Sequence, residues 1–353
     1  MSNRVKYTAA GLVILLVGLG GAGFLYRKHQ GRDIRGSSSI EFVTTEPKAA
    51  KEPPGLTWPM YGYDAARLRA PLGFNVHPPY RRAPLWTFRA GALLEFPPVI
   101  AFDAETGRIR WQRTIGPSES SPLVADNMVI VGDWSHDVYA FTAASGNLRW
   151  HFKAGGLVKG AISLSGNRVF FGSYDTHVYA LNLQTGKQVW RASSQPRIGR
   201  TGTFYADAAV AYGRVYIGAT DGKMYSFGAT TGKLRWSNGT GDFIYSSAAV
   251  WRGNILVGSY DGTFYSFDAA TGDIRWRFHA GGKISGSSSV IDGIVYFSTL
   301  SGRTYGLNAR NGKVVWSYPT GQYAATVASK SRLYLVGYSK LYALIRRPVK
   351  RAS

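Results

Sequence analysis

AFDAETGRIRW, residues Ala101 to Trp111, is the stretch of sequence that decides the fold, because the chain repeats it. Five further copies follow: AFTAASGNLRW, ALNLQTGKQVW, SFGATTGKLRW, SFDAATGDIRW and GLNARNGKVVW. The tryptophans that end successive copies are 39, 40, 46, 40 and 40 residues apart. A fixed period of this length is typical of stacked supersecondary units.

Each repeat predicts four short antiparallel strands. The unit that begins at Ser246 contains the runs SAAV, ILVGS, TFYSF and IRWRF, which are rich in β-branched and aromatic residues. Turns that contain glycine separate them, and the pair Asp261-Gly262 supplies the positive φ of a tight hairpin. Four strands in about forty residues make one blade of a β-propeller. The sequence therefore predicts an all-β chain of four-stranded antiparallel blades.

A tryptophan at a fixed place in the last strand of each blade offers a large apolar area. We expect it to be a core residue that packs between neighbouring blades and has no further role. LWTF, near residue 86, adds one more copy of this residue. The predicted blade-docking residues are Trp86, Trp111, Trp150, Trp190, Trp236, Trp276 and Trp316.

The pattern A-x-D-x-x-T-G-x-x-x-W resembles the tryptophan-docking repeat of the pyrroloquinoline-quinone (PQQ)-type β-propellers. In the first copy the matching residues are Ala101, Asp103, Thr106, Gly107 and Trp111. The resemblance covers roughly residues 58–345 and implies the same fold, but one fold hosts many activities. The chain is also similar to the propellers of the outer-membrane protein-assembly lipoproteins, although it contains no cysteine that could carry a lipid.

Closure of the ring determines the number of blades. The strand-like segment Pro84–Phe88 is expected to complete the last blade, which begins near Tyr323. This arrangement predicts seven blades. Eight is the alternative, because propellers of the family that the repeat resembles often have eight.

The repeat fails in its first blade, where Trp86 and Trp111 are only 25 residues apart. Residues 96–100 align with an inner strand, and residues 101–103 align with the end of a third strand. We therefore expect an incomplete blade, with a break, a strained crossing or poor order at the Ile100–Ala101 bond. Either the blade is a stub with unpaired edges, or about fifteen residues of the natural chain are absent from this sequence. We favour the second explanation, because every other repeat is complete.

An uncharged run of 19 residues, from Thr8 to Tyr26, is long enough to span a bilayer. Its basic flanks favour a retained transmembrane anchor over residues 1–32, with a cleaved signal peptide as the alternative. More basic residues follow the run than precede it, and this balance favours a cytoplasmic propeller. The family resemblance implies an extracytoplasmic propeller, and we favour this location. The G-x-G-x-x-G motif within the run is no dinucleotide site, because no βαβ unit surrounds it.

Composition defines the rest of the organisation. Residues 33–57 are rich in Ser, Pro, Lys and Glu and predict a flexible linker, residues 58–345 the propeller, and residues 346–353 a basic tail. The formal net charge is +22, and residues 301–353 hold ten Lys and Arg but no Asp or Glu. Such a charge attracts polyanions. Because the chain also has a predicted membrane span, we expect this positive charge to attract an anionic partner in the envelope rather than nucleic acid.

Ligand sites of propellers lie where the innermost strands converge. The residues that begin each blade are mostly small, with a few charged or aromatic exceptions. The blade between Trp190 and Trp236 is six residues longer than the usual forty, and its extra loop carries two arginines. The predicted ligand-binding residues are Glu119, Lys159, Arg197, Arg200, Tyr205, Asp207, Tyr245 and Tyr323.

No catalytic constellation is predicted. The six histidines show no metal-ligand spacing, and the chain has neither a G-x-S-x-G elbow nor a Walker loop. We expect a membrane-anchored, extracytoplasmic and non-enzymatic platform for binding or assembly in the cell envelope, with a protein or anionic partner and no cofactor or metal. The alternative is a degenerate quinoprotein-like oxidoreductase that uses PQQ and calcium. The sequence determines neither the identity of the partner nor the oligomeric state.

Overall fold

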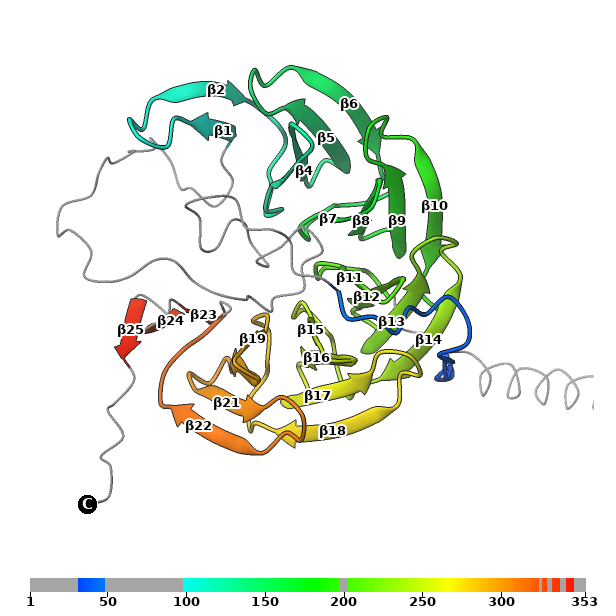
Figure 1. The fold of residues 1–353 in the computed structure, drawn as a ribbon, viewed down its shortest axis with the longest axis vertical. Coiled ribbons are helices and arrows are strands. Elements are labelled where there is room, and N and C mark those ends of the chain that lie inside the picture. The colour runs from blue at the N-terminus through cyan, green and yellow to red at the C-terminus, as the bar shows by residue number, and fades with distance from the viewer. Residues whose placement is uncertain are drawn as a thin grey trace, which may run out of the picture.

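The computed structural model describes residues 31–47, 98–196, 202–323, 326–328, 332–336 and 341–345. Across these ranges, strands form seven antiparallel sheets around a common axis (Figure 1). No helix in this described part is long and apolar enough to cross a membrane. The predicted anchor and the segment Pro84–Phe88 lie outside the described residues.

Five of the sheets have four strands, as the repeat predicts. The first two comprise β3 (Leu123–Ala125), β4 (Met128–Gly132), β5 (Asp137–Thr142) and β6 (Leu148–Lys153), and β7 (Ser163–Ser165), β8 (Arg168–Gly172), β9 (His177–Asn182) and β10 (Gln188–Ser193). The next two comprise β11 (Ala209–Ala211), β12 (Arg214–Gly218), β13 (Lys223–Gly228) and β14 (Leu234–Gly239), and β15 (Ala249–Trp251), β16 (Asn254–Gly258), β17 (Thr263–Asp268) and β18 (Ile274–His279). The fifth comprises β19 (Ser289–Ile291), β20 (Ile294–Ser298), β21 (Thr304–Asn308) and β22 (Val314–Tyr318).

Two shorter sheets flank these five along the chain. One comprises β1 (Val99–Phe102) and β2 (Ile109–Arg113), and the other β23 (Val327–Ala328), β24 (Arg332–Val336) and β25 (Leu341–Ile345). In Figure 1 the first strand of each four-stranded sheet lies near the axis and the fourth lies at the rim. The middle strands are therefore covered on both faces by neighbouring sheets, and β16 is buried along its whole length.

Five of the seven predicted docking tryptophans contact the next sheet, and Trp86 lies outside the described residues. Five indole Nε1 atoms donate hydrogen bonds to backbone carbonyls of the next sheet: Trp111 to Ala143 (2.8 Å), Trp150 to Leu183 (2.8 Å), Trp190 to Ala229 (3.1 Å), Trp236 to Ala269 (2.9 Å) and Trp276 to Ala309 (3.3 Å). The Trp236 ring also lies against Gly272, where a Cβ atom would stand 2.6 Å from Cδ2. Gly272 has a φ of +78°. The repeat needs glycine here for its conformation and for its small size.

The first sheet corrects one prediction. The strand β1 runs without interruption through the Ile100–Ala101 bond and pairs with β2, with Ile100 opposite Gln112 and Ala101 opposite Trp111. The expected break at this bond is therefore wrong. The alignment assigned Val99 and Ile100 to an inner strand, whereas they extend the third strand, in the place that Val138 and Tyr139 take in β5. Residues before Pro98 lie outside the described part.

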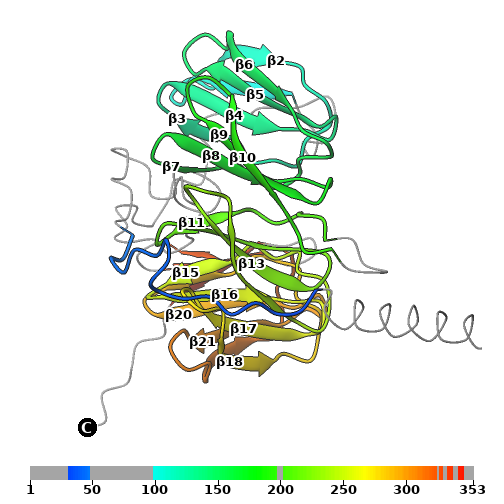
Figure 2. The same ribbon diagram turned by 90° about the vertical axis from the view of Figure 1, so that its right-hand side faces the viewer.

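Residues 31–47, which we call the strap, also differ from expectation. A flexible linker was predicted for residues 33–57, but the strap runs along the side of the propeller (Figure 2). Ile34 exchanges two backbone hydrogen bonds of 2.9 Å with Ser237 of β14. The buried guanidinium of Arg214 donates to three strap carbonyls, those of Ser37, Ile40 and Glu41. Phe42 of the strap also stacks on Tyr212, with ring centroids 5.4 Å apart. Composition could not reveal this order, because the partners of the strap lie far along the chain.

Candidate functional site

Two sets of loops open at the same end of the propeller. Because adjacent strands are antiparallel, the loops that precede the inner strands share an end with the turns between second and third strands. The predicted residues Glu119, Lys159, Tyr205 and Tyr245 lie in the first set of loops. The turns contribute Trp134, Tyr174 and Tyr260.

Lys159 forms the centre of one half of this site. Its side chain is 17% exposed, and Nζ lies 3.5 Å from Oε2 of Glu119. The same ammonium lies 4.0 Å from the centroid of the Trp134 ring, 5.6 Å from that of Tyr174 and 5.7 Å from that of Tyr205. A cation over an aromatic face is attracted by the ring quadrupole. The position of Lys159 is therefore fixed by one carboxylate and three rings.

Aromatic side chains continue the site across the next sheets. The rings of Tyr205 and Tyr245 meet edge to face at 5.2 Å, and Tyr245 meets Tyr260 at 4.9 Å. Phe243 lies 5.7 Å from Tyr245, and Lys283 Nζ lies 5.1 Å from the Tyr260 ring. We call this continuous set the aromatic surface, and it comprises Glu119, Trp134, Lys159, Tyr174, Tyr205, Phe243, Tyr245, Tyr260 and Lys283.

Two phenols of this surface, those of Tyr174 and Tyr245, have a raised pKa. Burial, together with the nearby Tyr245 and Glu119, raises the pKa of Tyr174 to about 12. Burial also raises the pKa of Tyr245, with smaller contributions from Tyr260 and Asp242. A neutral phenol can donate a hydrogen bond while its ring makes apolar contacts. The surface therefore offers several amphipathic groups at neutral pH.

The structure does not bring all the predicted residues together. Asp207 is buried, and its Oδ1 accepts a hydrogen bond of 2.8 Å from the backbone N–H of Ala161. This contact ties the starts of two blades together and gives Asp207 a structural role. Tyr323 is 59% exposed. Arg197 and Arg200 lie outside the described residues.

Sequence reasoning missed Lys283 and four aromatic members of the site, one of which is Phe243. The other three, Trp134, Tyr174 and Tyr260, each lie two residues after the second strand of a repeat, in the segments GDW, GSY and GSY. The equivalent residues of two other repeats are Thr220 and Leu300. A comparison of this turn position between repeats would have found these three aromatic residues. The prediction considered only the loops before the inner strands, which do not contain them.

The acidic residues of the described part do not fit a calcium-held quinone. No group of three or more His, Cys, Asp or Glu that could hold a metal ion occurs within these ranges. Asp221 and Asp261 instead accept hydrogen bonds from tyrosine hydroxyls of their own blades, Tyr225 at 2.5 Å and Tyr265 at 2.6 Å. We derive no redox step from these residues.

Comparison with known proteins identifies the family. The model of the family described as outer membrane protein assembly factor BamB matches residues 95–238 and 174–344. The crystal structure of BamB from Moraxella catarrhalis superimposes with a TM-score of 0.61 at 20% identity, over 70% of this chain and 78% of that one. This likeness concerns the fold alone.

Two curated relatives match shorter stretches. Quinoprotein alcohol dehydrogenase PedH of Pseudomonas putida is 32% identical over 120 residues, which are 31% of this chain and 19% of the enzyme. Outer membrane protein assembly factor BamB of Legionella pneumophila is 26% identical over 125 residues, 32% of each chain. The chain thus spans less than a third of the length of either relative. With the family model matching most of its length, the chain belongs to the family of outer membrane protein assembly factor BamB, and it is a PQQ-type β-propeller.

Proposed function

We propose that this protein is a non-enzymatic assembly platform that binds a protein partner in the cell envelope through the aromatic surface. The observation that carries this proposal is the continuous contact of Trp134, Lys159, Tyr205, Tyr245 and Tyr260 across four sheets. Tyrosine and tryptophan are enriched among the residues that dominate the energy of protein interfaces. They supply large contact areas at a low cost in side-chain entropy.

The scaffold makes the surface rigid. Trp134, Tyr174 and Tyr260 lie on turns of four residues, and both ends of each turn are strands of packed sheets. A preorganised surface loses little conformational entropy on binding. The family description, which names an assembly factor of the outer membrane, supports a protein partner in the envelope.

We also propose that residues 8–26 anchor the protein in a membrane and that the propeller is extracytoplasmic. The uncharged run of 19 residues supports the anchor. The description of the family as an outer-membrane assembly factor supports the location. Pelleting of the full-length protein with membranes after a high-salt wash is expected. A soluble mature form that begins near Phe24 would contradict the anchor.

Affinity purification tests the protein-binding role. The full chain carrying Tyr245→Ala and Tyr260→Ala is compared with a control carrying Val314→Ala and Val315→Ala, which are exposed residues of the outer strand β22. A partner that copurifies from the envelope with the parent and the control, and is lost with the tyrosine variant, supports the proposal. Equal recovery with all three proteins would contradict it.

A second candidate function is that of a quinoprotein-like oxidoreductase. The similarity to quinoprotein alcohol dehydrogenase PedH over 120 residues favours it. Absorbance spectra of the purified protein, with and without added PQQ and calcium, separate the two functions. A spectrum of protein-bound quinone would favour the oxidoreductase. A mixture whose spectrum equals the sum of the separate spectra of the protein and of free PQQ would favour the assembly platform.

A further inference from the structure

The strap begins at the end of the propeller that carries the aromatic surface. The carbonyl of Arg32 accepts a hydrogen bond of 3.0 Å from Nε2 of Gln195. Asp33 pairs with Nζ of Lys223 at 2.7 Å. Gln195 lies in the connection from β10 to β11, which also carries Tyr205, and Lys223 directly follows a turn between second and third strands. Both contacts therefore lie at the end where these loops and turns open.

From there the strap runs along the rim to the opposite end of the same sheet (Figure 2). Ile34 pairs with Ser237 of the outer strand β14. The Glu41 carboxylate then accepts hydrogen bonds from Thr230 and Thr231, which lie in the turn between β13 and β14. This turn is at the end opposite to the aromatic surface, because β13 joins the two ends. The strap therefore has a fixed direction, with its first residues beside the aromatic surface.

Few residues separate the proposed anchor from the strap. The uncharged run ends at Tyr26, and Arg32, which is held by Gln195, follows six residues later. An extended chain covers at most about 3.6 Å per residue, so this connection reaches roughly 20 Å. A strand of six residues, such as β13, is itself about 20 Å long. The connection is therefore too short to pass along the rim to the opposite end and still enter a bilayer.

We propose that the aromatic surface faces the membrane in which the chain is anchored, and that it binds the membrane-proximal part of an integral membrane protein. This inference rests on the proposed anchor and on the proposed protein-binding role. It adds to them the direction of the surface and the class of its partner. A partner held in the same membrane meets the surface at a high effective concentration, because both proteins are confined to one plane.

The shape of the surface favours a protein over lipid as its occupant. Aromatic side chains that insert into a bilayer reach about 5–10 Å into the boundary between headgroups and acyl chains. Among the aromatic residues of this surface, Phe243 alone is exposed, at 37%, and the other rings are partly buried against one another. The carboxylate of Glu119 would also be repelled by anionic headgroups. A packed amphipathic surface with a fixed charge suits the contact area of a protein.

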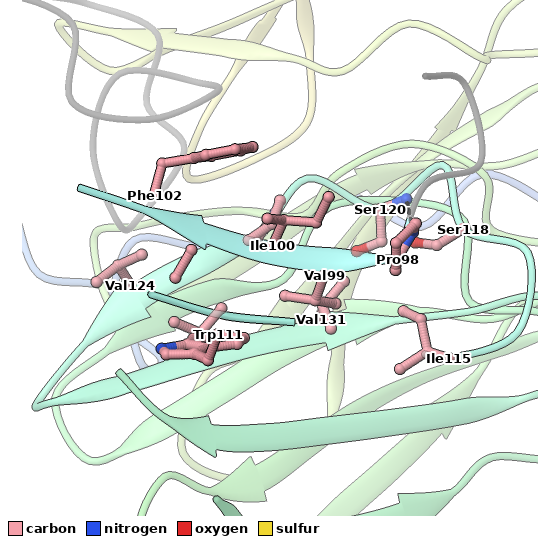
Figure 3. Close-up of a pocket in the computed structure, with 13 residues that line it drawn as sticks. Pro98, Val99, Ile100, Phe102, Trp111, Ile115, Ser118, Ser120, Val124 and Val131 are labelled. Carbon is pink, nitrogen blue, oxygen red and sulfur yellow. Dashed lines mark hydrogen bonds between the residues drawn. The ribbon is translucent and has the colours of Figure 1, made fainter. Parts of the chain in front are cut away.

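The loop that carries Glu119 is fixed on both sides of this residue. Figure 3 shows its neighbours Ser118 and Ser120 near Pro98. The Oγ of Ser118 donates a hydrogen bond of 2.7 Å to the carbonyl of Gly132, and the N–H of Gly132 donates one of 3.3 Å to the Oγ of Ser120. The carboxylate is therefore presented from a preorganised loop, as a specific protein contact requires.

Energy transfer from single labels to lipid measures the orientation. The chain has no cysteine, so Ser301→Cys and Arg310→Cys each introduce one thiol. Both residues are exposed, and they lie at opposite ends of β21, with Ser301 at the aromatic end. Full-length protein is reconstituted into liposomes that contain an acceptor lipid. Transfer from the label at position 301 is expected to be at least about twofold greater, because β21 separates the two positions by roughly 17 Å.

Two insertions test whether the short connection sets the orientation. A Gly-Ser insertion of about twenty residues between Lys28 and His29 reaches about 25 Å further and is expected to abolish the difference between the two labels. The same insertion between Ala49 and Ala50 is the matched control. It should leave the difference unchanged, because it follows the strap. An unchanged difference with the first insertion would overturn the argument from the connection.

Flotation separates failure of this inference from failure of the proposed function. Protein that does not float with the liposomes after a high-salt wash would contradict the anchor, and this inference with it. Protein that floats but shows equal transfer from the two labels, or greater transfer from position 310, would overturn the inference alone.

Crosslinking in cells tests the class of partner. A photoreactive amino acid is placed at Phe243, and at Arg310 as the control. A protein that is crosslinked from position 243 alone and stays in the membrane after alkaline extraction is expected. A crosslinked protein that alkaline extraction releases, a product with lipid alone, or no product from position 243 would overturn the proposal.

Discussion

The sheet β11–β14 and the sheet β1–β2 are built from the same repeat but are covered to different extents. Trp236 of β14 is completely buried, docks on Gly272 of the next sheet and lies beside the strap at Gly36. At the first sheet, the neighbouring Val124 is half exposed. We therefore expect the same sequence pattern to give different local stability, because each repeat depends on its neighbours for burial.

The strap increases this difference. Besides the carbonyls that accept hydrogen bonds from Arg214, it contributes the Glu41 carboxylate, which pairs with Arg235 and accepts hydrogen bonds from Thr230 and Thr231. Asp33 of the strap pairs with the Nζ of Lys223 at 2.7 Å. The strap therefore ties residues of β12, β13 and β14 together.

The largest effect is expected for Trp236→Ala. Deletion of a buried tryptophan typically costs about 3–5 kcal/mol. Trp276→Ala should also destabilise, and Trp316→Ala should cost about half of the Trp236 value, because both tryptophans are only partly buried. Chemical denaturation of the three variants measures the differences. Equal losses for Trp236→Ala and Trp316→Ala would contradict the docking comparison.

Gly272→Ala is expected to cost about 2–4 kcal/mol, as the sum of a left-handed conformation and a clash with the Trp236 ring. Gly166→Ala is the matched control, because Gly166 also has a positive φ, of +57°, but a Cβ atom added there would meet no other atom within 4 Å. The control should lose only the conformational part, about 1–2 kcal/mol. Thermal unfolding measures the melting temperatures of Gly272→Ala and Gly166→Ala. Similar values for the two variants would contradict the claim that the Trp236 ring needs a glycine to dock on.

Val250→Ala is expected to destabilise by about 1–3 kcal/mol through the lost apolar contacts and the cavity. Val124→Ala should change the free energy of unfolding by less than about 0.5 kcal/mol, because Val124 is already 54% exposed. Urea titration of both variants measures this pair. A large loss for Val124→Ala would contradict the difference in burial between the two valines.

The smallest effect concerns the pH dependence of the strap. Burial would raise the pKa of Glu41, but hydrogen bonds from Thr231 and Arg235 and the charge of Arg235 outweigh it and lower the pKa below 4.5. Ionised Glu41 therefore stabilises the folded state at neutral pH, and this contribution is lost as the pH falls through the lowered pKa.

The protection factors of the amides of residues 34–42, which correct for the intrinsic exchange rate at each pH, should accordingly fall in acid before the blades unfold. Glu41→Gln should lower these protection factors at neutral pH and reduce their change with pH. The role of the carboxylate would be contradicted if the protection of these amides in the parent protein stayed constant from neutral pH down to the pH at which the blades unfold.

The sequence predicted the repeat, the strand order within a blade and the docking tryptophans, because a period of forty residues with a glycine turn is a local signal. The predicted ligand-binding residues Glu119, Lys159, Tyr205 and Tyr245 lie at one repeat position, and their role in binding stays a prediction. The strap was missed because its partners lie far along the chain and Arg214 binds its backbone carbonyls, which carry no sequence signature. The continuity of β1 was missed because Val99 and Ile100 suit an inner strand and a third strand equally well.

In-cell photo-crosslinking tests the protein-binding role of the aromatic surface most directly. A photoreactive amino acid is placed at Tyr260 in one protein and at Val314, an exposed residue of the outer strand β22, in another. We predict a discrete crosslink to an envelope protein from position 260 and none to that protein from position 314. A crosslink to the same protein from position 314 alone, or no protein crosslink from position 260, would contradict the claim that the aromatic surface is the binding site.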